Sequence, residues 1–201
     1  MKKKISFLRT RFLEIAFVSA SAVLVLTLTL PSCNNEKTED TKEVADEHND
    51  AKFDNAKEND ANFLVSAAEI NLEEIQLGRL AQSRGTTSHI KELGKMVETE
   101  HTKALADLQA LAAKKQITIP TTITNNGMDA NKKLMETKAS NFDKEFADMM
   151  VSGHKDAIST FEKASTDAQD TEIRNWAASM LPALRLHLDH SIVCQKEGDK
   201  M

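Results

Sequence analysis

From Phe63 onward, apolar residues recur every three or four positions, which is the spacing of one face of an α-helix. Four such segments follow one another, separated by Gly, Pro or helix-capping residues. We predict helices at about 62–84, 88–115, 141–165 and from 171 onward. Their apolar stripes are Phe63, Ala67, Ile70, Leu77 and Ala81; Ile90, Leu93, Val97, Ala104, Leu108 and Leu111; Phe142, Phe146, Met150, Ala157 and Phe161; and Ile173, Ala177, Met180 and Leu184.

The pattern breaks between the second and third predicted helices. The segment Ile117–Gly127 contains Pro and Asn-Asn-Gly, and Met128–Lys138 can form a short helix. Ser140 to Asp143 resembles a capping box at the start of the third long helix. No long segment alternates with a period of two. The fold class is therefore predicted to be all-α: an antiparallel four-helix bundle with a short extra helix in the crossover between its second and third helices.

The N-terminus has the pattern of a bacterial lipoprotein signal peptide. Five basic residues precede position 12, Ile15–Leu30 is apolar, and Leu30–Cys33 reads LPSC. This pattern predicts a signal peptide over 1–32 and lipidation of Cys33. The alternatives are plain secretion and a single transmembrane anchor, although sixteen apolar residues are fewer than the roughly 20 that span a bilayer.

The segment that follows is acidic and poor in apolar residues. Residues 34–60 hold ten acidic residues and four lysines, with only Val44 and Phe53 as large apolar groups. Such a composition favours disorder. We predict a disordered acidic tether over 33–60 and one domain over 61–197. If Cys33 is lipidated, Cys194 is the only remaining thiol, and an intramolecular disulfide is excluded.

The charge balance restricts the partners. The formal net charge is −5, and no basic stripe is present, so nucleic acid is an unfavourable partner. The membrane, reached through the lipid on Cys33, is the partner that the sequence predicts. The expected location is the bacterial cell envelope, most simply the outer membrane, on its periplasmic or surface face.

Two similar stretches place a histidine in the same apolar frame. LGKMVETEHTKAL contains His101 and FADMMVSGHKDAI contains His154. His187 and Glu74 occupy equivalent places in the stripes of the fourth and first helices. Burying an ionisable group without a partner costs several kcal/mol. These four side chains must therefore meet one another, water or a metal ion.

Counting residues from the helix connections puts the four side chains at similar depths, within about 10 Å at 1.5 Å per residue. Glu74, His101, His154 and His187 are therefore candidate ligands of one transition metal ion, such as Zn, Fe, Cu or Mn. The alternative is a buried Glu–His hydrogen-bond network without metal. The sequence leaves both open.

A dinuclear carboxylate centre is disfavoured. Such a centre needs Glu-x-x-His on two helices, and only Glu98 with His101 has this spacing. Val151 and Leu184 stand three residues before the other two histidines. Glu98 and Glu100 are therefore read as solvated groups or as neighbours of the metal ligands, and enzymatic turnover is not the favoured function. No catalytic residues are assigned.

Four motifs span most of the predicted domain: LEEIQLGRLA (72–81), MVETEHTKA (96–104), FDKEFADMMVSGHKDAI (142–158) and LPALRLHL (181–188). Through these motifs the chain resembles a family of exported bacterial proteins of unknown function that have a ferritin-like bundle and are often labelled as outer-membrane proteins. The family pattern has Glu at 74 and His at 101, 154 and 187, and usually Asp before the first two histidines, where this chain has Glu100 and Gly153. The resemblance implies a ferritin-like fold and an envelope location, but no activity.

Two functions follow as hypotheses. The first is a membrane-tethered envelope lipoprotein whose bundle binds a metal ion for sequestration or stress tolerance. The second is a metal-free interaction or structural module of the envelope with a buried Glu–His network. An oxidase or a peroxide-consuming enzyme is the third and least favoured reading, because of Val151 and Leu184.

Overall fold

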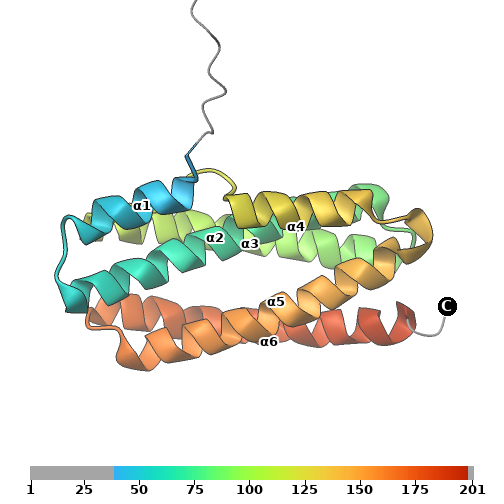
Figure 1. Ribbon diagram of the computed structural model, residues 1–201. Coiled ribbons are helices and arrows are strands. Elements are labelled where there is room, and N and C mark those ends of the chain that lie inside the picture. Colours follow the sequence, from blue (N-terminus) through green and yellow to red (C-terminus); the bar gives the residue numbers. More distant parts are fainter. Residues whose placement is uncertain (1–38, 199–201) are drawn as a thin grey trace, which may run out of the picture. The chain divides into compact units, whose positions relative to one another are not determined.

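Six helices account for most of residues 39–198, the part of the chain that this computed structural model describes (Figure 1). No strand is present in that part, so the predicted all-α class is confirmed. The predicted signal peptide and Cys33 lie outside the described residues. The helices are α1 (Thr41–Asp50), α2 (Asn55–Arg84), α3 (Ser88–Lys115), α4 (Asn125–Glu136), α5 (Ala139–Asp167) and α6 (Thr171–Gly198).

The four long helices pack as two antiparallel pairs. α2 packs most extensively on α3, and α5 on α6. In the first pair Asn71 meets His101 and Arg79 meets Glu98, so residue numbers fall on one helix as they rise on the other. Figure 1 shows α1 and α4 on one side of the α2/α3 pair and α5 with α6 on the other. The short helix predicted in the crossover is α4.

Local signals set most of the helix ends. Gly85 follows α2, and the Thr87 hydroxyl accepts a hydrogen bond from the Ile90 amide at the start of α3. Asp170 accepts from the amides of Glu172 and Ile173 at the start of α6. These hydrogen bonds satisfy amides that have no partner inside their helix.

The capping box predicted at Ser140 is wrong. α5 already begins at Ala139, and Lys138 precedes it without a side-chain cap. Asp143, the acidic residue of the supposed box, instead accepts hydrogen bonds from Thr86 and Thr87 in the α2–α3 connection. Its carboxylate therefore fixes a loop that is distant in sequence.

Residues 41–60, most of the segment predicted to be a disordered tether (33–60), are instead structured, because α1 lies within them and α2 begins at Asn55. Residues 41–50 form α1, which packs on α2. Asn49 is buried, and its amide group donates to the Thr118 carbonyl and accepts from the Thr118 amide. Asp60 is also buried and accepts from the amides of Gln169 and Asp170. Specific hydrogen bonds order this segment, and composition alone does not reveal them.

The core consists of two apolar clusters. One contains Leu64, Leu108 and Phe161, and the other contains Leu77 and Phe146. Along each long helix, the polar residue of the stripe lies between residues of the two clusters: Glu74 between Ala68 and Leu77, His101 between Val97 and Leu108, His154 between Met150 and Ala157, and His187 between Leu184 and Cys194.

None of the helices in residues 39–198 combines the length and the apolar character that crossing a membrane requires.

Candidate metal centre

Three of the four predicted residues converge between the apolar clusters. His101 on α3, His154 on α5 and His187 on α6 are 4%, 0% and 1% exposed. Their ring centroids are 5.2 to 5.7 Å apart. One ring nitrogen from each lies within 4.8 Å of one from each of the others. We call these three side chains the histidine triad.

His101 is held by Asn71 of α2. Its Nδ1 lies 3.0 Å from Asn71 Oδ1, and Asn71 Nδ2 donates to the Ala67 carbonyl at 2.6 Å. Since the amide nitrogen is used in that bond, the amide oxygen faces His101 and accepts from Nδ1–H. The lone pair of His101 is therefore on Nε2, and this buried atom has no hydrogen-bond partner among the described residues.

His154 is held by its own helix. Its Nδ1 lies 2.9 Å from the Met150 carbonyl oxygen. A carbonyl only accepts, so Nδ1 carries the hydrogen, and a neutral ring then has its lone pair on Nε2. That nitrogen lies 3.1 Å from Nδ1 of His187.

His187 is held by Glu100 of α3. Its Nε2 lies 2.9 Å from Glu100 Oε2. A carboxylate accepts, so Nε2 donates and Nδ1 has the lone pair. In each ring, one nitrogen is thus bonded to an acceptor outside the triad, and we call it the outer nitrogen. The other, inner nitrogen has the lone pair and is free to bind a cation. This is the usual arrangement around histidine ligands of metals, where the outer bond fixes the tautomer and the ring orientation.

The environment keeps the three rings neutral. Burial lowers the pKa of His101 well below its usual value, and the neighbouring His154 and His187 lower it further. Burial and His187 lower the pKa of His154 to about 4. Burial also lowers the pKa of His187, partly opposed by Glu100. Neutral imidazole is the form that binds metal, so protons compete weakly for these rings at neutral pH.

Glu74 lies beside the triad. Its Oε1 is 3.7 Å from His154 Nδ1, the nitrogen that bonds to Met150, and its Oε2 is buried without a partner among the described residues. Burial, with a smaller effect of Glu73, raises its pKa well above the usual value. The four-residue site expected from sequence is therefore a three-histidine group with Glu74 behind one ring.

The two remaining predicted residues differ in their positions. Glu100 contacts the triad through His187. Glu98 bonds to Arg79 and Gln82 on α2, away from the triad. Sequence reasoning missed Asn71. The signal was available, because Asn71 is a polar residue in the same helical stripe as Glu74, three positions earlier.

The fold and the site together define a class of protein: an all-helical chain with a buried histidine triad whose rings are held by hydrogen bonds. The chain belongs to the family described as domain of unknown function DUF4142, whose model matches residues 45–192. The match covers all four long-helix motifs and begins inside α1. A search of curated proteins found no match, and neither did a search of solved structures.

Proposed function

We propose that this protein binds one transition metal ion through His101, His154 and His187. The observation that carries the proposal is the set of three outer bonds, to Asn71, the Met150 carbonyl and Glu100. Together they direct three imidazole lone pairs toward one another in a buried space. Neutral imidazole is the commonest protein ligand of metals.

Counting protons supports a cation at the triad. The chain of contacts from the Met150 carbonyl through His154 and His187 to Glu100 has three links, and each link needs one hydrogen. Two neutral rings supply two. With Glu100 ionised, a third proton would charge a buried ring, which the lowered pKa values of His154 and His187 oppose. A metal ion at the inner nitrogens satisfies both lone pairs, and that of His101 Nε2, without a third proton.

The donor set narrows the metal. Three imidazoles suit Zn, Cu and Fe, whereas Mn prefers oxygen ligands. Cys194 belongs to the apolar cluster around Leu77 and is not part of the triad. Three protein ligands leave a fourth position for water or another small ligand. We expect Zn²⁺ or copper to bind most tightly.

The architecture and location form part of the same proposal. The antiparallel pairs α2/α3 and α5/α6, with α4 in the connection, support a ferritin-like four-helix bundle. The N-terminal LPSC pattern supports tethering to the cell envelope through a lipidated Cys33. Val151 and Leu184 occupy the places where a dinuclear centre would need carboxylates. Metal sequestration or stress tolerance is therefore favoured over turnover.

A metal-free interaction module is the second candidate. The observation in its favour is the direct 3.1 Å contact between His154 and His187, which one shared proton can make a hydrogen bond. It leaves His101 Nε2, which the metal ion would occupy, without a partner among the described residues, and a buried atom of this kind costs about 1–3 kcal/mol.

Metal analysis of the purified full chain distinguishes the two. We expect about one equivalent of metal after incubation with Zn²⁺ and gel filtration, and a loss of most of it in His101→Ala and His154→Ala. His89→Ala is the matched control, because His89 is an exposed histidine on α3 that pairs with Glu197. Clearly substoichiometric metal in the wild type, or equal content in all variants, would refute the proposal.

A further inference from the structure

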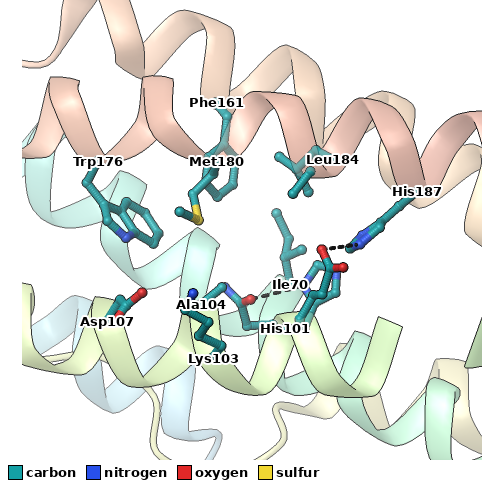
Figure 2. Close-up of a pocket in the computed structure, with 13 residues that line it drawn as sticks. Ile70, His101, Lys103, Ala104, Asp107, Phe161, Trp176, Met180, Leu184 and His187 are labelled. Atoms are coloured by element: carbon teal, nitrogen blue, oxygen red, sulfur yellow. Dashed lines mark hydrogen bonds and ion pairs between the residues drawn. The ribbon is translucent and has the colours of Figure 1, made fainter. Parts of the chain in front are cut away.

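A cavity of about 420 Å³ opens beside the histidine triad. It lies between α3 and α6, and Figure 2 shows His101, Lys103 and Asp107 along one side and Trp176, Met180, Leu184 and His187 along the other. Of the triad, His101 and His187 line this cavity. The cavity is thus next to the metal position on the side of these two rings.

The cavity is long and mostly apolar. Trp176, Met180, Leu184 and His187 are spaced four, four and three residues apart on α6, so they share one helix face. From Trp176 to His187 the helix rises about 16 Å. Ile70 and Phe161 complete the apolar part of the wall.

Two buried polar atoms of the wall have no partner in the described part of the chain, and they differ in kind: His101 Nε2 has a lone pair that accepts or binds a cation, whereas Trp176 Nε1 is a donor. His101 is 4% exposed, and its Nε2 has no partner among the described residues. Trp176 Nε1 is likewise buried without an acceptor there. Lys103 lies at the exposed rim, and no ion pair is found for it in residues 39–198. Glu100, one of the two carboxylates that line the cavity, already accepts from His187.

We propose that the cavity binds a small carboxylate with an elongated aromatic or aliphatic body. The inference rests on the proposed metal function: the carboxylate occupies the open metal position beside His101 and His187, and the body covers Met180, Leu184 and Trp176. Lys103 adds a positive charge at the rim. Two carboxylates also line the cavity: Asp107 is exposed on α3, where water and salt screen it, and Glu100 is hydrogen-bonded to His187.

Trp176 is the only tryptophan of the chain, so its fluorescence reports directly on the cavity. The probe is 4-phenylbutyrate, titrated into the full-length protein loaded with Zn²⁺, which does not quench tryptophan. We expect a saturable change in Trp176 emission. The Kd is expected to be at least 10-fold weaker in protein stripped of metal by a chelator. 4-Phenylbutan-1-ol, which has the same body without the carboxylate, is expected to bind at least 10-fold more weakly than 4-phenylbutyrate.

A pair of alanines on α3 locates the site. Ala104 lines the cavity, whereas Ala106 is exposed and does not. Ala104→Leu fills the cavity and should weaken 4-phenylbutyrate binding at least 10-fold while metal content stays at one equivalent. Ala106→Leu should leave both unchanged.

The outcomes separate this inference from the metal proposal. A protein that holds Zn²⁺ but shows no saturable response, or that binds the alcohol as tightly as the carboxylate, overturns the carboxylate site and leaves the metal site intact. Equal affinity in Ala104→Leu and Ala106→Leu also overturns it. A protein that holds no metal in the separate metal analysis overturns the metal site and this inference with it.

Discussion

Buried polar groups near the ends of the four long helices differ from those in the middle in how completely they are hydrogen-bonded. Near the ends, Asp143 accepts from the Thr86 amide at 2.8 Å, the Thr86 hydroxyl at 2.7 Å and the Thr87 amide at 2.9 Å. Asp60 accepts two amides, each at 2.8 Å. In the middle, Glu74 Oε2 and His101 Nε2 have no partner among the described residues.

This difference separates two roles for buried polarity. The two end carboxylates are completed by the chain itself, so they fasten loops and contribute to the fold. The middle layer leaves donors and acceptors incomplete, and an incomplete buried network is costlier than an apolar core. Stability alone does not account for the middle layer, whereas the proposed metal ion would give His101 Nε2 its missing partner.

Metal removal should produce the largest loss of stability. Only variants of residues in the middle of the long helices should abolish this loss. At a free Zn²⁺ concentration 1,000-fold above Kd, binding stabilises the fold by about 4 kcal/mol. For a domain of this size that corresponds to a rise in Tm of about 10 °C. Differential scanning calorimetry with Zn²⁺ and with a chelator measures it.

The Asp143→Ala variant is expected to retain this rise and His101→Ala to lose it. A chelator-insensitive Tm in the wild type would contradict the role assigned to the middle layer and favour the metal-free network.

Asp143→Ala should give the next largest loss of stability, and it should leave metal binding in the middle of the helices unchanged. It removes a buried carboxylate that accepts three hydrogen bonds. Since hydrogen bonds to charged groups contribute about 1.5–3 kcal/mol each and their losses are not additive, we expect a total cost of about 3 kcal/mol. Urea unfolding of the chelated protein measures it.

The matched control for Asp143→Ala is Asp156→Ala, an exposed aspartate on the same helix, which should change stability by less than about 0.5 kcal/mol. Equal costs for the two variants, or a loss of metal binding in Asp143→Ala, would remove the distinction between end and middle.

In the metal-free protein both regions lose stability as the pH falls, but they do so in different pH windows. The pKa of His154 is lowered from its usual 6.5 to about 4. The unfolded chain therefore binds a proton first as the pH falls, and the fold loses stability between about 6.5 and 4. From pH 7 to pH 5 the loss from His154 is about 2 kcal/mol.

Asp143 titrates in a more acidic window. Burial acts to raise its pKa, but the hydrogen bonds from Thr86 and Thr87 outweigh burial and lower it. The stabilisation that the Asp143 carboxylate gives the fold is present above about pH 3.8 and is lost below.

The difference in unfolding free energy between wild type and His154→Leu, measured in urea at pH 7 and pH 5, isolates the His154 contribution. A difference that does not change with pH would mean that His154 is not held neutral by the fold.

The helices and the inward histidines were predictable because both depend on local periodicity. A stripe with a period of 3.6 residues identifies each long helix and places His101, His154 and His187 on its inner face. Their similar depths follow from counting residues along helices of similar length. The range that the family model matches, residues 45–192, contains all three histidines.

The contacts between distant segments were not predictable in the same way. Asp143 looked like part of a capping box, because sequence spacing shows the neighbours within a helix but not the loop that packs against it. Asn49 and Asp60 looked solvated, because composition does not register single hydrogen bonds to residues 60 to 110 positions away. Periodicity placed Glu74 inward, but a helical stripe does not specify which nitrogen of His154 its carboxylate meets.

The smallest effect tests how the middle layer accommodates Glu74. A Cβ added to Gly153 would lie 3.1 Å from Glu74 Oε1, so the glycine leaves room for that carboxylate. Replacing Gly by Ala inside a helix normally gains about 1 kcal/mol. We expect Gly153→Ala to gain less than about 0.5 kcal/mol in the wild type and about 1 kcal/mol in a Glu74→Ala background. A double-mutant cycle by urea unfolding measures this coupling, and Ser152→Ala, an exposed neighbour, should give the same change in both backgrounds. If Gly153→Ala gains equally in both, the space at Gly153 does not serve Glu74, and this carboxylate would have to be placed in the polar layer by other contacts.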